Sequence, residues 1–83
     1  MRMLKVIRCE CTPHSVVYLE NYKMVAISYE ANYVKFFSFP CMKLERTVYL
    51  DDDGRHYLFL MKEKNMIGVT SYNKNLIEFI QLG

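Results

Sequence analysis

Three cysteines and a histidine are the residues of this chain best suited to bind a metal or attack a substrate. Cys9, Cys11 and His14 form the pattern C-x-C-x-x-H, and Cys41 is the remaining thiol. Zinc takes four such ligands but usually from paired knuckle spacings, which this pattern lacks. A nucleophilic thiol needs a histidine oriented by a third group, and none stands at a recognisable spacing. We therefore expect free thiols in a reducing, cytoplasmic compartment, and neither a metal nor another cofactor.

An acidic run is the second candidate for chemistry. Asp51, Asp52 and Asp53 precede Gly54, as at the start of a calcium-binding loop. Such a loop needs a bidentate acid several positions later, and residues 56–60 contain none. The run therefore predicts a solvated turn, in which Gly54 supplies a permissive backbone. Because no acid, base and nucleophile converge anywhere in the sequence, we expect no enzyme.

Aromatic residues beside lysines are the third candidate. The chain has seven Tyr and five Phe, and Lys35 and Lys43 lie among them, so these rings could stack on the bases of RNA. The net charge of only +2 disfavours nucleic acid, because the basic residues are scattered singly. A small β domain that binds RNA within a ribonucleoprotein particle is kept as the alternative function.

The elements that would position these residues are strands. Apolar runs and period-2 alternation, separated by polar turns and prolines, predict eight strands at 4–11, 16–19, 24–28, 33–39, 44–50, 57–61, 66–71 and 76–82. A helix over Leu19 to Tyr33 is an alternative, but Val25, Ile27 and Val34 fit a strand better. No run approaches the ~20 apolar residues of a membrane span, so we expect no membrane partner.

The second half of the chain repeats the first. Val16 and Leu58, Met24 and Met66, and Ile27 and Val69 are each separated by 42 positions. We expect a single β domain over 1–83, with repeat 1 at about 14–50, repeat 2 at about 56–83 and an N-terminal strand at 4–11. A period near ~40 with four strands per unit is typical of a propeller blade.

Residues 24–39, M-V-A-I-S-Y-E-A-N-Y-V-K-F-F-S-F, resemble the second and third strands of a WD-repeat blade. Ala26 and Ser28 stand where that family has small residues, and Phe37-Ser38 takes the place of its Trp-Asp pair. Residues 43–48, K-L-E-R-T-V, resemble the outer strand that follows. Of the family's hydrogen-bonded tetrad only Ser28 and Thr70 are in place, which implies blades held by aromatic and aliphatic packing.

The resemblance implies an all-β fold of two four-stranded antiparallel propeller-type blades, in strand order d-abcd-abc. Such a propeller is incomplete unless it assembles with other copies or belongs to a longer chain. The implied function is a non-catalytic protein-interaction scaffold that binds other protein subunits or further copies of itself. In WD-repeat proteins partners dock on the loops, so the resemblance places candidate partner-binding residues at Tyr29, Glu30, Asn32, Asp52, Arg55, Tyr72 and Lys74.

Overall fold

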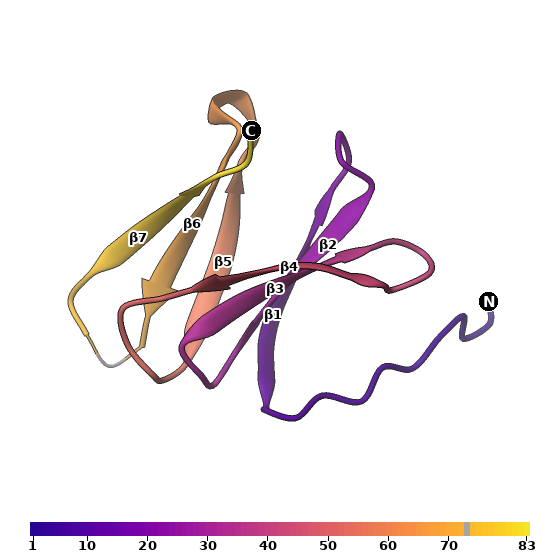
Figure 1. Ribbon diagram of the computed structural model, residues 1–83, viewed down its shortest axis with the longest axis horizontal. Helices are drawn as coiled ribbons and strands as arrows, with labels where there is room; N and C mark the ends of the chain where they lie inside the picture. The colour runs from indigo at the N-terminus through magenta and orange to yellow at the C-terminus, as the bar shows by residue number, and fades with distance from the viewer. Residues whose placement is uncertain (73) are drawn as a thin grey trace.

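The described residues form seven strands and one short helical turn. The computed structural model describes residues 1–72 and 74–83 (Figure 1). The strands are β1 (Pro13–Leu19), β2 (Met24–Tyr29), β3 (Tyr33–Ser38), β4 (Leu44–Tyr49), β5 (His56–Met61), β6 (Met66–Ser71) and β7 (Ile77–Gln81). A 3₁₀ turn, η1 (Lys62–Lys64), joins β5 to β6. The all-β prediction is confirmed, and the helix considered over Leu19 to Tyr33 does not form, because that stretch supplies β2 and the turns around it.

The strands form two antiparallel sheets, each in chain order. Sheet A has the order β1-β2-β3-β4 and sheet B the order β5-β6-β7. Neighbouring strands are joined by short turns, which favour antiparallel pairing. Four strands were expected in each blade, so sheet A matches this number and sheet B has one strand fewer among the described residues. The turn predicted between β6 and β7 includes residue 73, which lies outside the described residues.

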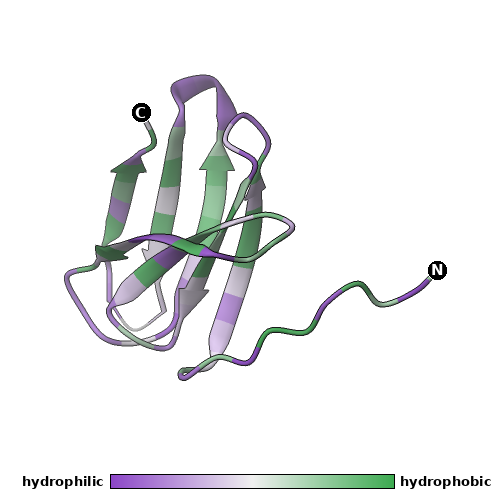
Figure 2. Ribbon diagram, turned by 45° about the vertical axis from the view of Figure 1, so that its right-hand side comes forward, coloured by the Kyte–Doolittle hydropathy of each residue, from purple (hydrophilic) through white to green (hydrophobic). Residues whose placement is uncertain are grey.

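The two sheets pack face to face around the main hydrophobic core. Figure 1 shows that the two sheets lie closest together near β1, β2 and β5 and diverge away from these strands. The buried core joins Ala26, Val34 and Phe36 from sheet A to Ile67 and Val69 from sheet B. Figure 2 shows hydrophobic residues alternating with hydrophilic ones along the strands, and mainly hydrophilic residues at the turns between them. Each sheet therefore has an inner face in this core and an outer face turned away from it.

The strand predicted over residues 4–11 does not form. Residues 1–10 are all exposed and residues 1–9 have no regular secondary structure. This N-terminal segment leaves the body of the molecule beside sheet A (Figures 1 and 2). It faces Val16, Val25 and Ile27 across a hollow of about 290 Å³. Alternation alone does not make a strand, because the N–H and C=O groups also need a ladder partner, and no strand among the described residues pairs with this segment.

The repeated residues do not occupy matching faces of the core. Ala26 lies in the core between the sheets, whereas Val25 and Ile27 belong to a separate cluster on the outer face of sheet A. Their counterparts 42 positions later, Ile67 and Val69, lie in the core. The two sheets therefore stack front to back, so that one face of the repeat covers the opposite face of the next repeat.

Candidate interaction surface

The loops that were expected to bind partners converge at one end of the molecule. Backbone hydrogen bonds join them: Ala31 N–H donates to the Gly54 carbonyl at 3.0 Å, and Tyr72 N–H donates to the Arg55 carbonyl at 2.9 Å. Figure 1 shows the β2–β3, β4–β5 and β6–β7 connections together at the lower end. We call the exposed residues of these loops the loop surface; they are Glu30, Asn32, Arg55, Tyr72 and Lys74.

Arg55 and Tyr72 form the most distinctive pair on the loop surface. The Arg55 guanidinium carbon lies 5.0 Å from the centre of the Tyr72 ring, and that tyrosine is 64% exposed. A cation over an aromatic face is weakly attractive at an exposed site and holds both side chains in place. Nearby, Glu30 accepts a hydrogen bond from His14 Nε2 at 3.4 Å. Arg and Tyr are enriched among residues that dominate protein interfaces.

Two of the predicted site residues are not on this surface. Tyr29 is 3% exposed and Asp52 is 6% exposed. Tyr29 packs in the cluster on the outer face of sheet A, with Val25, Ile27 and Ala31. Both side chains are buried and so do not belong to the loop surface, and their burial does not support their assignment as partner-binding residues. Position in a turn indicated exposure, but both side chains point back toward the sheets.

Asp52 belongs to a buried polar network between the sheets. Its Oδ1 lies 3.2 Å from His56 Nε2, and its Oδ2 accepts a hydrogen bond from Ser71 Oγ at 2.9 Å. The imidazole of His56 is fully buried, and its Nδ1 lies 3.4 Å from the Tyr29 carbonyl oxygen. The network thus fastens the β4–β5 loop to β2 and β6, and it explains why Asp52 departs from the solvated turn predicted for the acidic run.

A second group of hydroxyls continues this network across the core. Ser28 Oγ donates to the His56 carbonyl, and Ser15 Oγ lies 2.8 Å from Ser28 Oγ. Leu58 N–H donates to Ser15 Oγ at 2.8 Å. These bonds link β1 and β2 of sheet A to β5 of sheet B. Because buried polar groups are costly unless they are paired, the network specifies how the two sheets align.

Two buried residues, Asp52 and Tyr29, have shifted pKa values. Burial opposes the ionisation of Asp52, but the hydrogen bonds from His56 and Ser71 outweigh it and hold the pKa of Asp52 below its ordinary value. Burial, together with the nearby Cys9 thiol, raises the pKa of Tyr29 to about 12. Asp52 is therefore charged and Tyr29 neutral at physiological pH.

This cluster contains a serine, a histidine and an aspartate, but it is not arranged as a nucleophilic triad. Ser71 donates its hydrogen bond to the carboxylate of Asp52 rather than to the imidazole, so it lacks the serine–histidine hydrogen bond that defines such a triad. His56 is fully buried and has no access to a substrate. The arrangement is suited to holding the loops and sheets together.

The thiols lie apart from this network. Cys9, Cys11 and Cys41 are free, and Cys9 and Cys41 are exposed. Cys11 Sγ lies 3.3 Å from the Tyr33 hydroxyl, and that hydrogen bond is the main reason why the pKa of Tyr33 is raised to about 12. Over residues 1–72 and 74–83, no three His, Cys, Asp or Glu side chains gather as a metal site would require.

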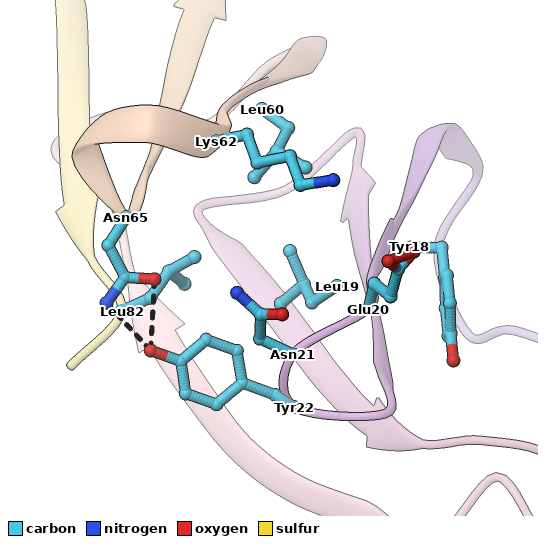
Figure 3. Close-up of a pocket in the computed structure, with 9 residues that line it drawn as sticks. All are labelled: Tyr18, Leu19, Glu20, Asn21, Tyr22, Leu60, Lys62, Asn65 and Leu82. Atoms are coloured by element: carbon cyan, nitrogen blue, oxygen red, sulfur yellow. Dashed lines mark hydrogen bonds between the residues drawn. The ribbon is translucent and has the colours of Figure 1, made fainter.

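A small pocket lies at the opposite end of the molecule, where sequence reasoning predicted no site. It has a volume of about 140 Å³ and is formed by the β1–β2 turn, η1 and Leu82 (Figure 3). The Tyr22 hydroxyl and the Asn65 side-chain amide exchange hydrogen bonds of 2.8 and 3.0 Å across its mouth. Ligand pockets usually measure about 300–1,000 Å³, so this one is small for a substrate. The Tyr22–Asn65 contact instead ties the two sheets together.

Comparison with known proteins gave no further assignment. No protein-family model, curated protein or solved structure matches this chain. Among the described residues there is no helix that is both long and apolar enough to span a membrane. The function is therefore inferred from the geometry above.

Proposed function

We propose that this chain is a non-catalytic protein-interaction module, built of two propeller-type blades, that acts as a scaffold in a larger assembly. The front-to-back stacking of the repeats is the observation that carries the proposal. Ala26 and Phe36 are 0% and 3% exposed because sheet B covers them, whereas the counterpart of Phe36, Phe79, is 57% exposed on sheet B. A face that is buried in the first repeat but exposed in the second needs a further sheet to cover it.

The loop surface supports the same function at the end of the stack. It combines an exposed tyrosine, an arginine and charges of both signs, and its backbone is fixed by hydrogen bonds between the loops. A preorganised surface loses less conformational entropy on binding than a flexible one. Its residues come from both repeats, so the surface exists only when the two sheets are stacked.

The alternative of RNA binding is less well supported. Tyr29 and Phe36 are buried, so neither ring can stack on a base. The Lys35 ammonium lies 5.0 Å from the centre of the Tyr33 ring, beside Tyr29, and it already makes a contact with the aromatic cluster of this chain. The affinity of the chain for an oligoribonucleotide, measured at increasing salt concentration, tests this alternative. Binding to RNA phosphates should weaken steeply as the ionic strength rises.

A photo-crosslinking residue in place of Tyr72 tests the proposed function. The full chain carrying it is exposed to native extract, irradiated, and analysed by mass spectrometry. We expect crosslinks to a protein, and we expect excess unmodified chain to suppress them and Arg55→Glu to abolish them. The matched control places the same crosslinker at Glu20, an exposed residue in the β1–β2 turn at the other end. Crosslinks that ribonuclease removes, or equal capture at both positions, would contradict the proposal.

A further inference from the structure

The free edge of β7 is the place where the structure is incomplete. In the described part of the chain β7 pairs only with β6, so its outer edge has no ladder partner. Ile77 and Phe79 project from its outer face and are 56% and 57% exposed. Sheet A has a fourth strand, β4, at the equivalent edge. An apolar edge strand of this kind is a template for a further strand.

The N-terminal segment has the sequence of the strand that sheet B lacks. Val6 lies 42 positions before Val48, so residues 2–7 correspond to β4, and residue 8 to Leu50 after it, by the offset that relates the two sheets. Leu4 and Val6 are 76% and 62% exposed. Its alternating apolar residues are therefore suited to a ladder, and within one molecule they have none.

Carrying the register of β3 and β4 over to the second repeat pairs two opposite charges. Lys35 lies opposite Thr47 in sheet A. The counterpart of Lys35, 43 positions later, is Glu78, and the counterpart of Thr47, 42 positions earlier, is Lys5. Directly opposite residues on antiparallel strands have their side chains on the same face, within about 5 Å at Cβ. Lys5 would therefore face Glu78.

The carboxylate of Glu78 can accept a further hydrogen bond from such a partner. Its Oε2 accepts a hydrogen bond from Asp51 N–H at 3.1 Å. Its Oε1 is buried and has no hydrogen-bond partner among the described residues. An unpaired buried carboxylate oxygen is costly, and a lysine ammonium would satisfy it. In the single molecule the Lys5 ammonium donates a hydrogen bond to the exposed Cys41 carbonyl at 3.1 Å.

The space beside β7 is also open. A hollow of about 340 Å³ lies between β4 and β7, lined by Arg46 and Val48 on one side and Ile80 and Leu82 on the other. The two sheets diverge there (Figure 1), because β4 has no fourth strand of sheet B opposite it. An added strand would narrow this hollow from its open side.

From these observations we infer that residues 2–8 of one copy add as a fourth strand to the free β7 edge of a second copy, with Lys5 opposite Glu78. This rests on the propeller-type stacking of the proposed function. The same step places the outer face of sheet B against the outer face of sheet A in the next copy, as sheet A packs on sheet B within one chain. The contact is head-to-tail, and it closes into a ring if about two to four copies supply the four to eight sheets of a propeller.

The molar mass of the full chain in solution, measured by light scattering after size exclusion, tests the inference. We expect the wild-type chain to assemble into a closed ring, with a molar mass about two to four times that of the monomer. A chain without residues 2–8 should have the molar mass of a monomer. Lys5→Glu and Glu78→Lys should each weaken association about tenfold or more, and the double variant should restore it. Lys5 lies in a segment without secondary structure, so Lys5→Glu cannot act by unfolding the sheets.

The controls separate strand addition from other causes. Lys64→Glu makes the same charge change at an exposed residue of η1 and should leave the assembly intact. Arg55→Glu should also keep the assembly while it abolishes crosslinking from the residue in place of Tyr72, so the failure of one proposal is distinguishable from the failure of the other. A wild-type monomer at about 200 μM, or an assembly that survives loss of residues 2–8, would overturn the inference.

Discussion

Replacing Asp52 by alanine should cost this protein a large part of its stability. The substitution removes the acceptor of two buried hydrogen bonds, from His56 and from Ser71. His56 is fully buried, so water cannot take the place of the lost carboxylate without opening the interface between the sheets. The effect should therefore appear in the free energy of unfolding rather than in the loop surface alone.

The size of the loss in stability follows from the two hydrogen-bond donors, on His56 and Ser71, that are left without an acceptor. A buried donor left without a partner costs about 1–3 kcal/mol, so two cost about 2–6 kcal/mol. Removing the carboxylate also removes the cost of burying its charge, which reduces the expected loss to about 2–4 kcal/mol. A chain of 83 residues has a total stability of about 4–12 kcal/mol. The melting temperature should fall by at least about 8 °C.

Urea unfolding followed by circular dichroism measures this loss. The matched control is Asp53→Ala, which removes an exposed carboxylate from the same turn and should change the free energy of unfolding by less than about 0.5 kcal/mol. Asp52→Asn should lose less than Asp52→Ala, because its amide oxygen can still accept one of the two hydrogen bonds. If Asp52→Ala is no less stable than Asp53→Ala, the network does not hold the sheets together as argued.

Three further predictions concern acid stability, close packing and thiol reactivity. The pKa of Asp52 is lowered in the folded protein, so the ionised carboxylate stabilises the fold above the unfolded-state pKa, and this stabilisation is lost as pH falls through the folded-state pKa. The free energy of unfolding, measured from pH 6 downward, should therefore fall less steeply in Asp52→Ala than in Asp53→Ala. A Cβ on Gly68 would collide with the far end of the Phe59 ring, which must shift to make room, so Gly68→Ala should cost about 1 kcal/mol on urea unfolding and almost nothing in a Phe59→Ala background. The hydrogen bond with Ser38 lowers the pKa of the exposed Cys41 thiol, so iodoacetamide should label Cys41 faster than Cys11 by mass spectrometry, and Ser38→Ala should reduce the difference.

The positions of the seven observed strands could be predicted because each is a short apolar or alternating run between polar turns. Met24 to Tyr29 and Met66 to Ser71, for example, are strands over nearly the residues expected. The pairing within each sheet also follows from the sequence, since consecutive strands joined by short turns pair with each other there, although β4 and β5 do not. The stacking of the sheets does not, because period-2 alternation shows that a strand has two faces but not which face meets which sheet.

The candidate site could be predicted only in part. Five of the seven residues lie on the loop surface, because turns at one end of a β meander come together regardless of their sequence. Asp52 and His56 were missed as a pair. They are four positions apart across an irregular loop, and nothing in the sequence separates one acid of an acidic run from its neighbours. Tyr29 was assigned to a turn although it is the last residue of β2.

An exposed apolar edge is a hazard to a protein unless its pairing is restricted, and the charges in this chain supply such a restriction. A slip of one residue would move Lys5 from Glu78 to an apolar neighbour of β7 and would turn Leu4 and Val6 to the opposite face. It would also leave Glu78 Oε1 buried without a partner, as it is in the single molecule. Registers shifted by one or two residues place Leu4, Val6, Met3 or Ile7 opposite Glu78 and leave that oxygen without a cation, so the pair penalises these registers as well as stabilising the proposed one. This charge pair would favour a specific assembly over the non-specific aggregation that an exposed edge lined by Ile77 and Phe79 would otherwise promote.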